Sequence, residues 1–183
     1  MENRIIYEGD LLLYPCPTVL VTSKLMDREN VFTVSWAGIA SSHPEYITIG
    51  INRKRYSYSL IKESHKFCIN IPNSDMIGKV DYCGSHSGRD VDKFLSCDFK
   101  KTYYGEEFIL IDNCPVNLIC TVEHIYPLGS HDLFVGHVER KFIDKTSKDI
   151  HAQLKPIIYF RPNYYGVSEN PLGYYGFTKD VKQ

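Results

Sequence analysis

The chain has 183 residues, of which 21 are Lys or Arg and 22 are Asp or Glu, so its formal net charge is −1. This near-neutral balance gives no electrostatic reason to expect a nucleic-acid or membrane-surface partner. Hydrophobic residues make up 43% and charged residues 23%, which is typical of a globular protein and predicts a single domain over residues 1–183.

Short runs of β-forming residues dominate the chain. The expected strands cover residues 18–23, 31–40, 46–51, 67–71, 116–125, 132–143 and 156–160, with a bend or bulge at Gly38 in the second. Helical patterns are short and cover 57–64, 74–83 and 91–95, and Ser57 is the expected cap of the first helix. Many strands with few helices predict a mainly β protein, a β-barrel with a few short helices.

Tyrosine is unusually common, with 14 residues against one Trp. Tyr-Tyr-Gly occurs at 103–105, 164–166 and 174–176, and two of these copies lie in a Tyr-rich C-terminal tail, 161–183. Tyr joins a flat apolar face to a polar tip, which suits ring-shaped ligands and interfaces, although it also simply fills strands. The tail contains many turn-forming residues, which predicts a segment laid over a surface.

The six cysteines show no Cys-x-x-Cys spacing, and a chain of this length does not need disulfides to fold. No segment resembles a signal peptide or approaches the roughly 18 apolar residues of a membrane span. We therefore expect a reduced, cytoplasmic protein. Nucleophile-elbow, Walker A, dinucleotide-binding and His-Glu-x-x-His motifs are missing from the sequence, so it identifies no certain catalytic residue and predicts no metal site.

Three polar clusters are candidates for ligand binding. In residues 30–44, hydroxyl and small residues alternate with apolar ones, which suits backbone contact with a planar ligand or, alternatively, an edge strand. In residues 52–58, basic side chains precede a helix start, which indicates a phosphate cradle or a solvated turn. In residues 84–94, a Gly/Ser loop carries Arg89 and Lys93 and allows close approach of a ligand, or is simply the loop before a helix.

His131 and His137 are six residues apart and therefore share one face of the strand expected there. Contact between His131 and a ligand is favoured over a metal pair, because no acidic or Cys partner shares that face nearby.

The order of these segments resembles the flavin reductase-like family, which has the FMN-binding split-barrel fold of Greek-key type. The similarity covers roughly residues 11–160, and Ser87-Gly-Arg89 followed by Asp92-Lys-Phe94 is its most specific part. The other matching segments are 15–23, 30–36, 40–51, 55–57, 63–71 and 131–136.

The resemblance implies an FMN-binding oxidoreductase that passes hydride from NAD(P)H to flavin, with FAD as an alternative cofactor. Two alternatives are a flavoredoxin-like electron carrier without direct NAD(P)H use, which would act with a redox partner protein, and a non-enzymatic cofactor-binding barrel. The resemblance also implies a homodimer with the flavin near the subunit interface.

The resemblance further implies which residues hold the flavin. His131 would face the flavin or the nicotinamide, and Tyr164 and Tyr165 of the tail would cover the site. The cofactor-binding residues implied by the resemblance are Asn30, Val31, Phe32, Thr33, Ser35, Trp36 and Ala37 for the ring, Ser41, Ser42, Arg55 and Ser57 for the phosphate, and Ser87, Gly88, Arg89 and Lys93 for the closing loop.

Overall fold

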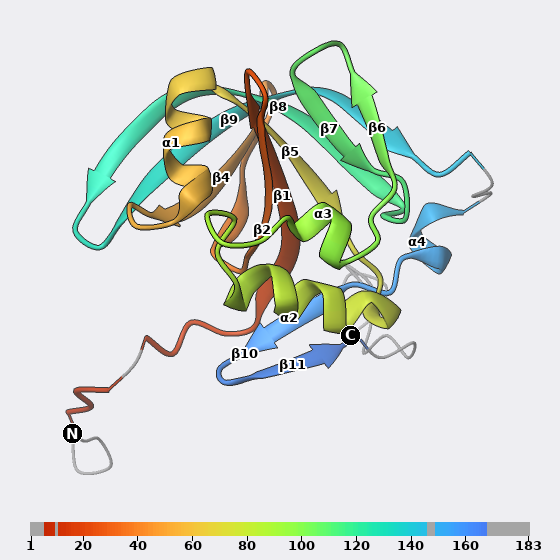
Figure 1. The fold of residues 1–183 in the computed structure, drawn as a ribbon. Helices are drawn as coiled ribbons and strands as arrows, with labels where there is room; N and C mark the ends of the chain where they lie inside the picture. The colour runs from red at the N-terminus through yellow and green to blue at the C-terminus, as the bar shows by residue number, and fades with distance from the viewer. Residues whose placement is uncertain (1–5, 10, 146–148, 168–183) are drawn as a thin grey trace.

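Antiparallel strands dominate the computed structural model, which describes residues 6–9, 11–145 and 149–167 (Figure 1). The strands are β1 (Cys16–Leu25), β2 (Arg28–Val34), β3 (Ala37–Ser42), β4 (Glu45–Asn52), β5 (Lys66–Ile71), β6 (Lys101–Tyr104), β7 (Phe108–Ile111), β8 (Val116–Leu128), β9 (His131–Ile143), β10 (Ile157–Phe160) and β11 (Asn163–Gly166). The helices are α1 (Tyr56–Ser64), a 3₁₀ turn η1 (Ser74–Met76), α2 (Ile77–Ser85), α3 (Lys93–Ser96) and α4 (Ile150–Gln153). The predicted mainly β fold with a few short helices is confirmed.

One sheet contains nine strands, eight of them in the order β11-β10-β1-β5-β8-β9-β4-β3, and β2 pairs with β1. Strands β6 and β7 pair with each other in a separate two-stranded sheet. The path of the large sheet runs from β11 to β3 without closing, as a split barrel requires. The register pairs Asn52, at the end of β4, with His131, at the start of β9.

The run 31–40 is not one strand bent at Gly38, as the sequence suggested. It breaks after Val34, because β2 pairs with β1 whereas β3 pairs with β4. Trp36 lies between the end of β2 and the start of β3, and its carbonyl accepts a hydrogen bond from the Gly50 N–H of β4 at 2.8 Å. The break therefore places the only Trp of the chain at the junction of two strand pairs.

Two further expectations need correction. Arg55, not Ser57, is the N-cap of α1, so Ser57 lies inside the first helical turn, where it is completely buried. The hairpin of β6 and β7 was not expected, since exposed residues of β6 carry no apolar alternation.

In the C-terminal tail, residues 163–166 form strand β11 at the edge of the sheet, and the third Tyr-Tyr-Gly copy lies outside the described residues.

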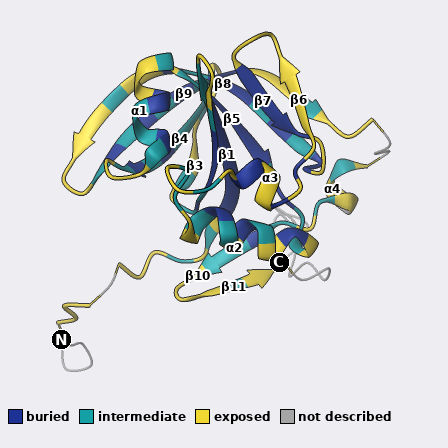
Figure 2. Ribbon diagram, viewed as in Figure 1, coloured by how far each residue is buried: buried dark blue, intermediate teal, exposed yellow. Residues whose placement is uncertain are grey.

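Two apolar clusters make up most of the core. One lies inside the curved sheet under α1 and includes Phe67 and Phe134, and the other lies between β1, β2, α2, α3 and β7 and includes Val31 and Val80. Figure 2 shows this distribution, with β1 and β5 mostly buried and β6 and β11 exposed. Helix α2 lies near β10 and β11 in Figure 1. Val80 and Cys83 of α2 and Phe94 of α3 belong to the second cluster, so these helices cover it.

Buried polar contacts attach the β6–β7 hairpin to the large sheet. Asn70 on β5 is completely buried, and its amide oxygen accepts hydrogen bonds from Ile111 N at 2.9 Å and Asn117 Nδ2 at 2.8 Å. Its amide nitrogen donates to Leu20 O and Thr22 Oγ1, both at 3.2 Å. One side chain thus connects β1, β5, β7 and β8.

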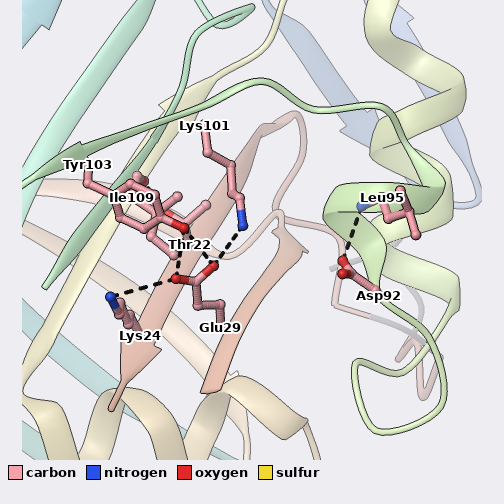
Figure 3. Close-up of polar contacts among 8 residues, drawn as sticks. All are labelled: Thr22, Lys24, Glu29, Asp92, Leu95, Lys101, Tyr103 and Ile109. Atoms are coloured by element: carbon pink, nitrogen blue, oxygen red, sulfur yellow. Dashed lines mark hydrogen bonds and ion pairs between the residues drawn. The ribbon is translucent and has the colours of Figure 1, made fainter. Parts of the chain in front are cut away.

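A second, more exposed attachment involves Glu29 on β2 (Figure 3). Its carboxylate accepts hydrogen bonds from Lys101 Nζ at 2.8 Å and from the Tyr103 hydroxyl at 3.0 Å, and it lies 3.7 Å from Lys24 Nζ.

In the part of the chain that the structure describes, no helix is both long and apolar enough to cross a membrane.

Candidate functional site

Two adjoining cavities follow strand β2 and the helix starts beside it. Their volumes are about 330 and 300 Å³, and Phe32, Asn52 and Arg55 line both. Together they form one elongated site between β2, the start of α1 and the end of α2. We name the two parts the ring cavity and the helix-start cavity.

The ring cavity has aromatic and polar walls. The rings of Trp36 and His131 lie 4.4 Å apart by their centroids, and Tyr164 of β11 lines the same cavity. Burial, and then the nearby charge of Arg55, hold the pKa of His131 below its ordinary value. Both effects favour the neutral form of the His131 ring. The complete lining is Phe32, Thr33, Val34, Ser35, Trp36, Gly50, Ile51, Asn52, Arg55, Asp81, Gly84, Ser85, His131 and Tyr164.

The helix-start cavity lies at the N-terminus of α1, where unpaired backbone N–H groups and the helix dipole favour an anion. Ser57 in this first turn accepts hydrogen bonds from Asn30 Nδ2 at 2.8 Å and from Ser23 Oγ at 3.2 Å. Because Ser57 accepts both, its own hydroxyl proton is available to a ligand. The complete lining is Asn30, Phe32, Asn52, Lys54, Arg55, Tyr56, Ser57, His86, Ser87, Gly88 and Lys93.

Lys93 is the most unusual group of the site, because it is only 3% exposed although it lines this cavity. Its ammonium donates to the Cys83 carbonyl at 2.8 Å. Among the described residues, no carboxylate lies within ion-pair distance of Lys93. Burial lowers its pKa to about 8. A buried cation without a counter-ion indicates a place for a bound anion.

Two arginines hold the backbone around the helix-start cavity. Arg55 donates to the Gly84 carbonyl at 2.9 Å and so joins the start of α1 to the end of α2. Arg89 donates to the Lys54 carbonyl at 3.0 Å, and its guanidinium lies 5.4 Å from the centre of the Tyr56 ring. The loop after α2 is therefore fastened to the loop before α1.

The loop approaches the cavity most closely at Gly88. A Cβ built there would lie 2.2 Å from Asn30 Oδ1 and 2.8 Å from Tyr56 Cδ1. Only a residue without a side chain allows this contact, so Gly88 is required by space rather than by backbone angle.

Replacing Gly88 with Ala is expected to push the loop away from Asn30 and weaken binding of an anionic ligand at the helix-start cavity. The matched control is Gly78→Ala, because a Cβ at Gly78 in α2 meets no atom within 4 Å. We expect Gly78→Ala to leave ligand affinity unchanged and to stabilise the helix by about 0.5–1 kcal/mol. Ligand titration of both variants measures the difference, and equal affinities would contradict the steric role of Gly88.

Asp132 anchors the segment that carries Arg55. Its carboxylate accepts hydrogen bonds from Arg53 Nε at 2.8 Å and from the Tyr58 hydroxyl at 2.6 Å, and only 4% of the residue is exposed. The hydrogen bonds from Arg53, and then that from Tyr58, lower the pKa of Asp132 to about 2. The start of β9 is thus tied to the loop after β4 and to α1.

This contact predicts a pH dependence of the free energy of unfolding. Since the pKa of Asp132 is lower in the folded than in the unfolded chain, its contribution is complete above about pH 4 and is lost as the pH falls through 2. Asp132→Asn should remove this contribution and lower stability most at pH 5–7. Urea unfolding at pH 7 and pH 3 measures it, with Glu63→Gln at the exposed Arg28 pair as the control. A similar loss in both variants would contradict a special role of Asp132.

The structure brings most of the sequence-predicted site residues together and separates the others. Val31 lies in the core under α2, and Ala37 packs against the other core cluster. Ser42 pairs with Glu45, at the opposite end of β4 from Asn52, so Ser41 and Ser42 lie roughly 20 Å from the helix-start cavity along the strand. Arg89 lies in the loop after α2 and lines neither the ring cavity nor the helix-start cavity. The predicted cofactor-binding and catalytic candidates that do line one of the two cavities are Asn30, Phe32, Thr33, Ser35, Trp36, Arg55, Ser57, Ser87, Gly88, Lys93 and His131.

Sequence reasoning missed several lining residues. Asn52 lines both cavities because it ends β4 beside the start of α1; it lay in the candidate cluster 52–58 but was not named as a cofactor-binding residue. Asp81 and Ser85 face the ring cavity from α2, and His86 follows at the end of that helix. Ser85 and His86 lay in the candidate cluster 84–94 without being named as contacts, and no sequence signal distinguished Asp81 from an ordinary solvated helix face.

Comparison with known proteins agrees with the split barrel that the open sheet defines. The sequence model of the family described as "Flavin reductase like domain" matches residues 11–168. The chain therefore belongs to the flavin reductase-like family, and the predicted fold and family are confirmed.

Relatives support this assignment over most of the chain. An uncharacterised protein of Archaeoglobus fulgidus is 29% identical over 150 residues, which is 81% of this chain and 82% of that protein. The crystal structure of flavoredoxin from Methanosarcina acetivorans has a TM-score of 0.88 at 25% identity and covers 98% of this chain and 100% of its own. Flavoredoxin of Desulfovibrio vulgaris has a TM-score of 0.83 at 26% identity, with coverages of 94% and 98%.

Proposed function

We propose that this protein binds FMN across the two cavities, with the phosphate in the helix-start cavity. The observation that carries the proposal is the buried Lys93 ammonium, which has no carboxylate partner among the described residues and lines the cavity at the start of α1. A phosphate monoester brings nearly two negative charges and three acceptor oxygens. Lys93, Arg55, the Ser57 hydroxyl and the backbone N–H groups of α1 supply donors of matching number and charge.

The ring of the flavin would occupy the ring cavity. Trp36, His131 and Tyr164 offer flat faces, while Thr33, Ser35 and the backbone of β2 offer polar edges. Part of this wall is already fixed, because the Thr33 hydroxyl donates to the Val80 carbonyl of α2. The ribityl chain would pass Phe32, Asn52 and Arg55, which line both cavities.

We further propose an oxidoreductase of the flavin reductase type. When bound, FMN would supply the chemistry of hydride transfer from NAD(P)H, and the residues of the ring cavity would orient the flavin and nicotinamide rings. A neutral His131 beside Trp36 suits this role, since it contacts an uncharged ring without adding charge. The residues of the site hold and shield the cofactor, so no acid–base pair is needed.

Spectroscopy tests the proposal directly. The purified protein, or the protein after addition of FMN, should show the absorbance band of bound flavin. Binding should also quench the fluorescence of Trp36, the only Trp of the chain, which gives a titration without added probes. A protein that neither binds FMN by absorbance nor shows quenching would contradict the proposed function.

A second function is favoured by the two flavoredoxins that cover nearly the whole chain. In that case the protein carries electrons on FMN and does not react with NAD(P)H itself. Anaerobic addition of NADH or NADPH separates the two functions. Rapid bleaching of the flavin supports the reductase, whereas bleaching only in the presence of a reduced partner protein supports the carrier. FAD in place of FMN, a homodimer and a cytoplasmic location remain predictions.

A further inference from the structure

Two cysteines beside the site take no part in the proposed function. Cys83 lies in α2 and Cys97 directly after α3, and their sulfur atoms are 3.9 Å apart. Both are buried in the same apolar cluster, with 0% and 6% of the residue exposed. No other pair among the six cysteines has sulfur atoms in hydrogen-bond contact in the structure, and all six are free thiols.

The positions of these thiols matter because of what lies between them in the sequence. The segment from Cys83 to Cys97 contains Ser87, Gly88 and Lys93 of the helix-start cavity. The Cys83 carbonyl is also the acceptor for the Lys93 ammonium at 2.8 Å. A covalent bond between the two sulfur atoms would turn this segment into a closed ring.

We propose that Cys83 and Cys97 are a modification site, at which an intramolecular disulfide forms reversibly and fixes the loop that closes the helix-start cavity. The contact requires the two sulfur atoms to approach by about 2 Å, which side-chain rotation and a small shift of α3 can provide. Helix α3 has only four residues, so its position can adjust by a small amount. Asp92 Oδ1 accepts a hydrogen bond from Leu95 N at 3.1 Å at the start of this helix, and Lys93 Nζ donates to the Cys83 carbonyl at 2.8 Å, so α3 stays next to Cys83 (Figure 3).

The oxidant required is a low-molecular-weight disulfide such as glutathione disulfide. Cys97 is the more accessible thiol, so its thiolate attacks the glutathione disulfide first and releases one glutathione. The Cys83 thiolate then displaces the second glutathione and closes the protein disulfide. Two thiols lose two electrons and two protons, and one glutathione disulfide becomes two glutathione molecules.

Burial sets the rate of this exchange. It raises the pKa of both thiols, and the positive charge of Lys93 partly opposes the rise at Cys83. Few thiolates are therefore present at pH 7, and the reaction should be slow and should accelerate with pH. Once formed, the disulfide restricts the motion of residues 84–96 between the two cysteines, so the loop over the helix-start cavity opens less readily.

The test uses the whole protein in glutathione buffers of increasing oxidised fraction, followed by acid quenching, alkylation and trypsin digestion. Trypsin cuts after Lys79, Arg89, Lys93 and Lys100, so the disulfide joins two separate peptides, 80–89 and 94–100. We expect this linked pair in the wild type and in Cys114→Ala, which changes another thiol of the same cluster, and its loss in Cys97→Ala. Cys16, which is partly exposed, reports that the oxidant has acted.

Alkylated Cys83 and Cys97 in a sample where Cys16 carries glutathione would overturn the proposal. The effect on the loop has its own readout, which rests on the proposed FMN binding: the oxidised wild type should release FMN several-fold more slowly than the reduced form, and oxidation should not slow release from Cys97→Ala. Linked peptides with unchanged release would overturn the control of the loop. A chain that forms the linked peptides but binds no FMN would contradict the proposed function and leave the disulfide established.

Discussion

Replacing Lys93 with Met should raise the dissociation constant for FMN about 10- to 100-fold, because one charge-assisted hydrogen bond to a phosphate contributes roughly 1.5–3 kcal/mol. Riboflavin, which lacks the phosphate, should bind almost as well to the variant as to the wild type. Methionine keeps most of the length and the apolar stem of the side chain, and removal of a buried charge without a counter-ion offsets the lost hydrogen bond to the Cys83 carbonyl, so the fold should be retained. The measurement is a titration of Trp36 fluorescence with each flavin.

The matched control is Lys79→Met. Lys79 lies on α2 and donates to the Asp98 carbonyl at 3.3 Å, so it resembles Lys93 in its bonding but lies at the surface. It should leave both flavins unaffected. An equal loss of FMN and riboflavin affinity in Lys93→Met would contradict phosphate binding by this residue and indicate a structural role.

Lys93 also predicts a pH dependence of binding. Its pKa in the free protein is about 8, and a bound phosphate favours the charged form. FMN affinity should therefore be nearly constant between about pH 6.5 and 7.5, where the phosphate is mostly doubly charged and Lys93 is protonated, and should fall as the pH rises through 8, where binding requires uptake of a proton. Lys93→Met should lose this dependence.

Asn70→Ala should lower the free energy of unfolding by roughly 3–4 kcal/mol, the largest stability effect that we expect from a polar residue of this chain. The substitution leaves the buried Ile111 N–H without its side-chain acceptor and leaves the Asn117 amide nitrogen with the Ile111 carbonyl, at 3.2 Å, as its remaining acceptor. It also removes the donor to the Leu20 carbonyl. Since these groups attach β7 to β1, β5 and β8, the hairpin of β6 and β7 should loosen first.

Urea unfolding measures the loss, and hydrogen exchange at Ile111 reports the hairpin. The control is Asn113→Ala, because Asn113 lies exposed in the turn before β8 and should change stability by no more than about 0.5 kcal/mol. A loss at Asn70 of similar size to the control would contradict the role of this side chain as a buried junction.

Much of the fold was accessible from the sequence because alternation and composition report local structure. The strands from Glu45 to Asn52 and from Lys66 to Ile71 were placed to within a residue or so, since their apolar positions follow the pleat. The division between β2 and β3 was not predictable, because residues 31–40 are β-forming throughout. Which strand each part pairs with depends on long-range register, and that decided the break at Ser35 and Trp36.

The candidate site shows the same division between local and long-range information. Arg55, Ser57 and Gly88 were identified because a basic turn, a helix start and a glycine loop are local signals. Ser41 and Ser42 have equally favourable chemistry, but antiparallel pairing with β4 carries them to the far end of the hairpin. Lys93 is buried, whereas Arg89 lies on the outside of the loop. This difference follows from how α3 packs on β2, which the sequence does not show.

The buried charge of Lys93 has a consequence for the life of the protein in a cell. An ammonium kept from water without a counter-ion costs free energy of folding, and a bound anion removes that cost. Ligand present at 100 times its dissociation constant adds about 2.7 kcal/mol to stability. Newly made chains that meet no cofactor should therefore unfold more often and be degraded sooner, so the supply of cofactor would set how much of this protein accumulates.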